Sequence, residues 1–128
     1  MSNLNSIDPN DIASVKVGPG CFRRDLPSNE SVRIWIVEME PGSQWPYEDI
    51  HDETGEQVLI LSGELIEGDR RFGPGTYLNF GPGSRHQPRT ETGARLFGVN
   101  VKAAELRSGG VSVKSFGGAV IPRLTGVP

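Results

Sequence analysis

Two histidines and one glutamate stand at positions where they could hold a metal ion together. The chain has only two histidines, His51 and His86, and Glu56 lies five residues after the first of them. Imidazole and carboxylate groups suit manganese, iron, nickel, cobalt or zinc, whereas magnesium and calcium favour oxygen shells. The residue types therefore predict a divalent-metal site. The spacing by itself also allows the simpler interpretation that all three are ordinary surface side chains.

The strand that would position Glu56 is the apolar segment 56–61, Glu-Gln-Val-Leu-Ile-Leu. It is rich in Val, Ile and Leu and ends at Ser62-Gly63, as expected for a strand followed by a turn. Side chains two positions apart share one face of a strand. Glu56 would thus lie at the mouth of a barrel, with Val58 and Ile60 beneath it on the same inner face.

The two histidines would reach this mouth from loops. His51 is separated from the strand by a short loop that can fold back, and His86 follows the turn Gly81-Pro82-Gly83. Glycine and proline favour tight turns because glycine tolerates positive φ and proline fixes φ. The sequence therefore predicts that both imidazoles converge on Glu56.

The composition indicates many short strands and little helix. The 128 residues include 17 glycines and 10 prolines, spread among short apolar segments. Such a density of turn formers predicts an all-β barrel or sandwich in a single domain, preceded by a polar lead-in over residues 1–13 with a turn of helix or a loop at 8–11. Strands are expected at residues 14–17, 31–40, 56–61, 64–67, 76–80, 94–101 and 111–116.

Charge and hydropathy exclude several classes of partner. The net charge is -3 and no basic stripe occurs, which argues against nucleic acid. No apolar run approaches the roughly 20 residues that span a bilayer, and the first residues lack the features of a signal peptide. A cytoplasmic protein without membrane contact is therefore expected. Cys21 is the only cysteine, and without a paired base we expect it to be buried and not nucleophilic.

The segments around the histidines resemble the two motifs of the cupin superfamily, nearest to the branch with ChrR-type anti-sigma metal domains and acetylacetone-dioxygenase-like proteins. The first motif has a glycine, two histidines with one residue between them, a glutamate and a second glycine. The matching residues are Gly42, His51, Glu56 and Gly63. The second has a glycine, a Pro-x-Gly turn and a histidine, matched by Gly75, Gly81-Pro82-Gly83 and His86, with Gly81 in place of the usual proline. The resemblance covers about residues 31–101. It implies that residues 1–128 form one cupin domain, a double-stranded β-helix or jelly-roll barrel.

The resemblance also implies a ligand set, with one departure. Metal cupins of this kind usually supply three histidines and one glutamate, and Asp49 occupies the position of the first histidine. The implied ligands of a divalent Fe, Mn, Ni or Zn ion are therefore His51, Glu56, His86 and Asp49. Gln57 is a reserve ligand if the strand register shifts by one residue, and Glu48 is another if the loop bulges.

Five further side chains are candidates for binding a small-molecule ligand. Aromatic residues could line a pocket or simply pack in the core or at its rim, and an arginine inside the barrel could hold an anionic substrate or instead lie on the surface. The candidates are Trp45, Tyr47, Tyr77, Arg33 and Arg95.

The resemblance implies a metal-dependent, dioxygenase-like enzyme that acts on a small chelating substrate such as a diketone. One alternative is a non-catalytic metal- or ligand-sensing cupin that acts with a separate protein partner. Another is a metal-free barrel that serves as a binding or structural module. We also expect a homodimer, because the terminal segments 111–116 and 119–124 are apolar enough to cross to a partner.

Overall fold

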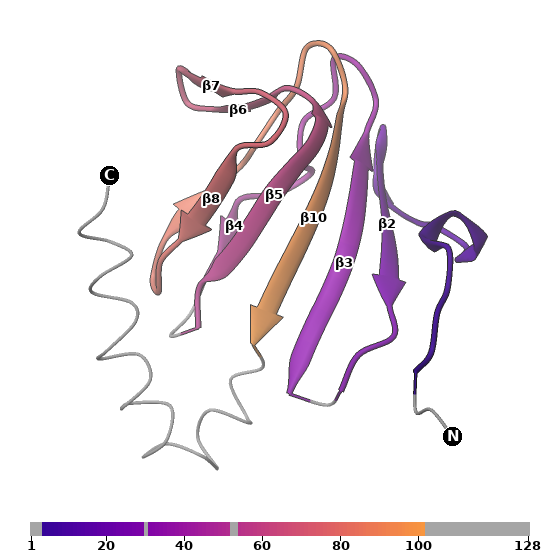
Figure 1. Ribbon diagram of the computed structural model, residues 1–128. Coiled ribbons are helices and arrows are strands. Elements are labelled where there is room, and N and C mark those ends of the chain that lie inside the picture. Colours follow the sequence, from indigo (N-terminus) through magenta and orange to yellow (C-terminus); the bar gives the residue numbers. More distant parts are fainter. Residues whose placement is uncertain (1–3, 30, 52–53, 102–128) are drawn as a thin grey trace.

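The computed structural model describes residues 4–29, 31–51 and 54–101, and this part of the chain is built almost entirely of β-strands (Figure 1). The expected segments 111–116 and 119–124 lie outside the described residues, so the dimer stays a prediction. A 3-10 helix, Pro9–Asp11, occupies the place of the expected helical turn and is capped by the Asp8 side chain. The strands are β1 (Val15–Gly18), β2 (Cys21–Leu26), β3 (Val32–Met39), β4 (Asp49–Ile50), β5 (Glu56–Gly63), β6 (Leu65–Glu67), β7 (Arg70–Phe72), β8 (Tyr77–Phe80), β9 (Arg85–His86) and β10 (Ala94–Val101).

The main layer is a six-stranded antiparallel sheet with the order β1-β2-β3-β10-β5-β8. Two further pairs of short strands, β4 with β9 and β6 with β7, form separate ladders. Backbone bridges from Arg89 to Gln44 and to Ile66 connect the segments that carry these two ladders. In Figure 1 the strands β2, β3, β10 and β5 lie side by side, and the β6–β7 hairpin lies at one end of them. No helix in the described part of the chain is long and apolar enough to cross a membrane.

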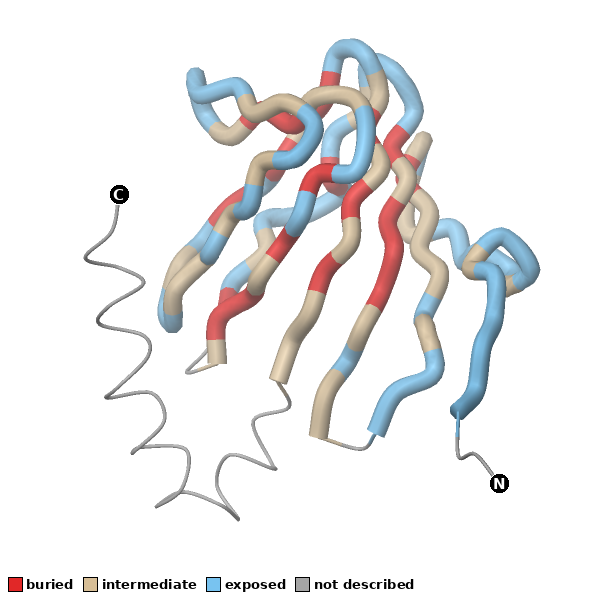
Figure 2. Tube along the Cα trace, in the orientation of Figure 1, coloured by how far each residue is buried: buried red, intermediate tan, exposed pale blue. Residues whose placement is uncertain are grey.

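The central strands show the predicted alternation. Glu56, Val58 and Ile60 of β5 are buried, whereas Leu59 and Leu61, at alternate positions of the same strand, are exposed. Figure 2 shows the same change between buried and less buried positions along β10. A side-chain period of two therefore gives the large sheet one inner face and one outer face.

The register aligns the inner-face residues of β3, β10 and β5 in rows across the sheet. The partners across β3 and β10 include Arg33 with Asn100 and Trp35 with Gly98, and β5 continues each row. The first row lies at the open end, and the rows beneath it are apolar, so the sheet has a polar rim and an apolar floor. From the rim inward the rows are Arg33–Asn100–Glu56, Trp35–Gly98–Val58 and Val37–Leu96–Ile60.

Candidate metal centre

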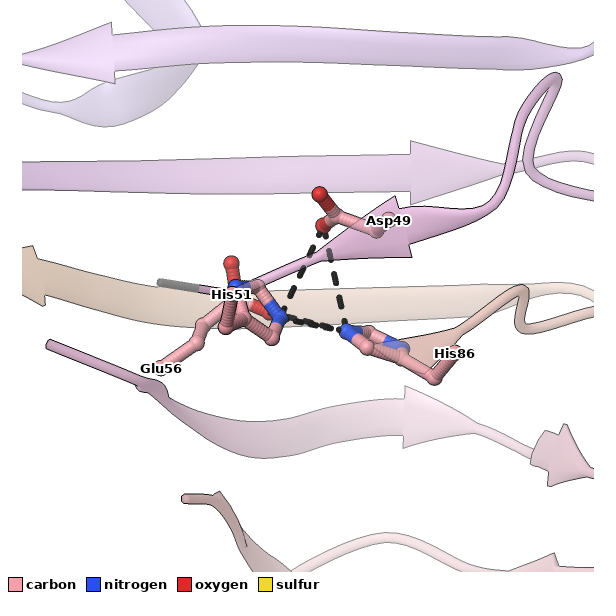
Figure 3. Close-up of side chains that lie close together, drawn as sticks. All are labelled: Asp49, His51, Glu56 and His86. Carbon is pink, nitrogen blue, oxygen red and sulfur yellow. Dashed lines mark hydrogen bonds and ion pairs between the residues drawn. The ribbon is translucent and has the colours of Figure 1, made fainter. Parts of the chain in front are cut away.

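Four potential metal ligands come together at the rim of the sheet (Figure 3). One donor atom from each of Asp49, His51, Glu56 and His86 lies within 4.8 Å of the others. The two Nε2 atoms of His51 and His86 are 2.6 Å apart. Oε1 of Glu56 is 3.4 Å from His51 Nε2 and 3.6 Å from His86 Nε2, and Oδ2 of Asp49 is 3.8 Å from each. The structure thus brings together all four residues that the sequence singles out.

Short ladders and tight turns position these side chains. Asp49 in β4 is the direct partner of His86 in β9, so their side chains project to the same side. His51 follows β4 and is fixed by two backbone hydrogen bonds: its N–H donates to the Ser84 carbonyl at 2.8 Å, and its carbonyl accepts from the N–H of Gly83 at 2.8 Å. Gly83 has φ +80, which glycine adopts without strain. The expected glycine-rich turn therefore holds both histidines.

The donor set fits a divalent transition metal. An ion about 2.1 Å from each ligand requires neighbouring donors to lie roughly 3.0–3.4 Å apart in octahedral or tetrahedral geometry. The separations that involve a histidine nitrogen, from 2.6 to 3.8 Å, lie on both sides of that range, and all four donor atoms lie within 4.8 Å of one another, so an ion would need only modest side-chain movements. Two imidazole nitrogens and two carboxylates match metals such as iron, manganese or zinc better than calcium or magnesium.

A carboxylate behind His86 was not foreseen in the sequence. Oε2 of Glu67, in β6, accepts a hydrogen bond from Nδ1 of His86 at 2.7 Å, and the Phe80 ring stacks on the same imidazole at 3.9 Å between centroids. A proton held on Nδ1 turns the Nε2 lone pair toward the cluster, which is the tautomer that binds metal. Glu67 is therefore a positioning residue for His86.

Glu56 is held by a chain of hydrogen bonds that the sequence analysis also did not predict. The indole N–H of Trp35 donates to Asn100 Oδ1 at 2.7 Å, and Asn100 Nδ2 donates to Glu56 Oε2 at 3.2 Å. The Trp35 ring packs directly over Gly98, where an added Cβ would lie 2.0 Å from the ring. Because the indole fixes the amide orientation, Oε2 of Glu56 is engaged and Oε1 is left facing the histidines.

The close charges shift two pKa values in the cluster. Burial lowers the pKa of the His86 imidazole, but the carboxylates of Glu56 and Glu67 outweigh it and raise that pKa to about 9. Burial, reinforced by the charge of Glu56, raises the pKa of the Asp49 carboxyl, although both histidines and Arg33 act in the opposite direction. A pKa raised above its ordinary value favours a proton on His86 in the metal-free protein, and a metal would have to displace this proton.

The cluster forms part of the wall of a cavity of about 440 Å³. This volume suits a small organic molecule. The floor is apolar and comes from β3, β5, β6 and β10, and its residues are Trp35, Val37, Met39, Val58, Leu65 and Leu96. The cavity therefore places a candidate metal centre beside a surface that favours apolar groups.

Three of the five candidate ligand-binding residues line this cavity, and two do not. Trp45, Tyr47 and Arg33 are among the lining residues. Tyr77 is half-exposed and pairs with Leu59 on the outer face of the sheet. Arg95 lies between the inward residues of β10, so its side chain projects outward and pairs with Glu38 at 3.3 Å. Strand alternation therefore places Tyr77 and Arg95 outside the cavity.

The reserve ligands and the cysteine also lie away from the donor cluster. Gln57 is on the opposite side of β5 from Glu56, and the exposed Glu48 pairs with Arg85 at 3.6 Å. Cys21 is fully buried, as expected, and its thiol donates to the Gln44 carbonyl at 3.4 Å. Burial raises the pKa of this thiol, which disfavours the reactive thiolate.

Comparisons with known proteins identify the fold. A scan against protein-family models and a search of curated proteins found no match. Among solved structures, an RmlC-like cupin from Shewanella frigidimarina is similar at 17% identity and a TM-score of 0.66, over 76% of this chain and 89% of that chain. The polyketide cyclase RemF from Streptomyces resistomycificus is similar at 18% identity and a TM-score of 0.66, over 77% and 79% of the two chains. One chain in the complex of Rhodobacter sphaeroides SigE with the anti-sigma ChrR is similar at 20% identity and a TM-score of 0.64. The similarity covers 71% of the present chain and 50% of the chain in that complex.

The protein is therefore an all-β barrel with the fold of the RmlC-like cupins, as the resemblance in the sequence predicted. Its inner face carries a candidate metal centre, and solved structures with this fold include an enzyme and an anti-sigma complex.

Proposed function

We propose that the protein is a divalent-metal-dependent, oxygenase-like enzyme that acts on a small chelating substrate of the diketone type. The observation that carries this proposal is the position of the donor cluster, which opens onto an apolar cavity of about 440 Å³. His51, His86, Glu56 and Asp49 would hold the ion. A bound iron would supply Lewis acidity and access to oxygen chemistry.

The protein's own groups would orient the ligands and receive the substrate. Glu67 keeps the Nδ1 proton on His86, and Asn100 leaves Oε1 of Glu56 toward the histidines. The apolar floor would bind the carbon skeleton of the substrate and limit access of water to the centre. Beyond the four ligands and two arginines, Tyr47 is the only titratable side chain among the described residues that line the cavity.

The metal content of the purified protein tests this proposal first. Protein prepared without chelators or a histidine tag should contain about one equivalent of a transition metal, measured by mass spectrometry of the elements. His51→Ala and His86→Ala should each lose it. Gln57→Ala is a matched control, because it alters β5 on the face opposite Glu56 and should retain the metal. Absence of metal after anaerobic reconstitution with iron, manganese, nickel and zinc would refute the metal centre.

Turnover then separates an enzyme from a sensor. The iron-loaded protein should consume oxygen with acetylacetone or a related diketone, and His51→Ala should not. The second candidate, a metal- or ligand-sensing protein that acts with a separate partner, is favoured by the fold likeness to the SigE–ChrR complex. Retention of metal and ligand without consumption of any diketone, together with a stable protein partner, would favour this second candidate.

A further inference from the structure

Arg33 occupies the rim of the cavity, in the same row as the metal-ligand Glu56. It lies on the inner face of β3, directly opposite Asn100 of β10, and Asn100 in turn contacts Glu56 of β5. Adjacent strands are about 4.8 Å apart, so the backbones of Arg33 and Glu56 are separated by roughly 10 Å. A long arginine side chain and a small ligand can bridge this distance.

The guanidinium of Arg33 makes no direct hydrogen bond or ion pair with any residue that the structure describes, although its charge acts on the nearby carboxyl of Asp49. Every other arginine in this part of the chain has a carboxylate or an aromatic ring beside it. At the same cavity, Arg23 pairs with Asp25 at 3.0 Å. The remaining contacts are those of Arg24 with Glu38, Arg70 with Phe72, Arg71 with Glu64 and Glu91, Arg85 with Glu48, Arg89 with Glu91, and Arg95 with Glu38. Arg33 is thus available to a ligand.

The cationic side chain at the rim of the cavity favours an anion. Asp49 and Glu56 contribute two negative charges to the cluster, which a divalent ion would cancel. Asp25 offsets Arg23 and Glu67 contacts His86, so Arg33 is the cationic side chain on the described lining that no carboxylate pairs directly. A guanidinium recognises a carboxylate through two parallel hydrogen bonds, which adds geometric selectivity to the charge attraction.

We propose that Arg33 is the carboxylate-binding residue of the cavity, and that the ligand is a small carboxylic acid with an oxygen donor close to the acid group and an apolar remainder. The acid would face Arg33, the oxygen donor would face the cluster of His51, Glu56 and His86, and the apolar remainder would lie on the floor formed by Trp35 and its neighbours. This inference rests on the proposed function, since it narrows the small chelating substrate of the same site to one that carries a carboxylate close to its oxygen donor.

Intrinsic fluorescence provides a test that does not need turnover. The chain has two tryptophans, Trp35 and Trp45, and both line the cavity. The acid probe is 4-methyl-2-oxopentanoate, which carries a carboxylate, an adjacent oxo group and an isobutyl group. Its methyl ester is the neutral counterpart. Both compounds are titrated into metal-free protein and into zinc-loaded protein, because zinc is redox-inactive.

The acid should bind the wild-type protein, and Arg33→Met should weaken its binding about tenfold or more, as expected for loss of a charge-assisted contact. Binding of the ester should be weak and unchanged by the substitution. Lys16→Met is the matched control, since it removes one positive charge from an exposed position on β1, outside the cavity lining. Arg33→Lys should recover only part of the affinity, because an ammonium cannot form the paired contact.

Three results would overturn the inference: equal binding of acid and ester, equal binding of the acid by wild type and Arg33→Met, or no acid binding at millimolar concentration. The metal content of each variant is measured in parallel. Wild-type protein that binds one metal ion but does not prefer the acid over the ester would refute the role of Arg33 alone. Acid binding that depends on Arg33 in protein that never binds metal would refute the metal centre alone.

Discussion

Replacing Glu67 with glutamine tests how the cluster prepares His86 for a metal. Glu67 accepts the Nδ1 proton at 2.7 Å and helps to raise the pKa of His86 to about 9. Its charge therefore has two opposing effects. It makes His86 a better donor to a metal, an effect worth about 10- to 100-fold in affinity at such positions. It also makes His86 bind its proton more tightly, and a metal must displace that proton to bind.

The pH separates these two effects. With a pKa of about 9, only ~1% of His86 is neutral at pH 7, so proton competition costs roughly 100-fold in apparent affinity. At pH 9 about half of the imidazole is neutral, and the wild-type affinity should rise about 50-fold. Glu67→Gln lowers the pKa of His86 and relieves part of this competition at pH 7. The variant should therefore bind metal almost as well as wild type at pH 7 and about 10- to 100-fold more weakly at pH 9.

The assay is competition for zinc against a chelator of known affinity, at several pH values from 6.5 to 9. Glu64→Gln is the matched control, because Glu64 lies next to the same hairpin and pairs with Arg71, not with His86. Its affinity should follow that of the wild type at every pH. If the ratio of wild-type to Glu67→Gln affinity stays constant over this range, Glu67 does not act through the proton on His86, and the reasoning fails.

Three further perturbations probe the supporting structure. Gly98→Ala should lower the free energy of unfolding by about 1–3 kcal/mol, measured in urea, because its Cβ would lie 2.0 Å from the ring of Trp35. Asn100→Leu should weaken zinc binding by about tenfold in the same chelator competition, because Glu56 loses the amide that donates to Oε2. The metal-free protein should lose at most about 3 kcal/mol of stability as the pH rises from 6.5 to 9, measured by urea unfolding at each pH. The folded state holds a proton on His86 that the unfolded state releases near pH 6.5, so this stabilisation is complete below that pH and is lost through pH 9.

Matched variants control these experiments. Gly73→Ala adds a methyl group where no atom lies within 4 Å and should leave stability unchanged. If Gly98→Ala were equally stable, the packing of the indole on the sheet would be contradicted. Asn79→Leu replaces an exposed asparagine on β8 and should bind zinc like the wild type. An Asn100→Leu protein that binds zinc equally well would argue against a role for the amide. A stability that does not change from pH 6.5 to 9 would contradict the raised pKa of His86.

The long central strands could be predicted because a side-chain period of two is a property of the backbone itself. The expected segments 31–40 and 94–101 correspond to β3 and β10, and the inner face of β5 follows from alternation. β2 was not predicted, because three consecutive charged residues, 23–25, interrupt its apolar character. The two-residue strands β4 and β9 exist only through pairing with each other, and no local pattern reveals a partner 35 or more residues away.

The candidate metal ligands could be predicted from the sequence because few residue types can bind a transition metal. His51, His86 and Glu56 could be selected by chemistry before any geometry was known. Glu67 and Asn100 could not, because glutamate and asparagine are common in strands and their roles depend on tertiary contacts. Asn100 reaches Glu56 because β10 and β5 pair as far as Val99 and Gln57, which brings the next residue of each strand within hydrogen-bond distance.

The register of the sheet places the candidate metal ligands and the candidate acid-binding residue on different strands. Asp49, in the place of a third imidazole, brings the carboxylates of the cluster to two, so a divalent ion would leave the ligand set without net charge. Such a centre has no surplus positive charge with which to attract an anion. Attraction would then come from a separate cation, and Arg33 is the described cationic side chain of the cavity lining that makes no direct ion pair. Under the two proposals, β4, β5, β9 and the loop of His51 would hold the ion, and Arg33 of β3 would recognise the acid. Substitutions of the candidate metal ligands can therefore change metal binding and leave acid binding intact, and substitutions of Arg33 can do the reverse.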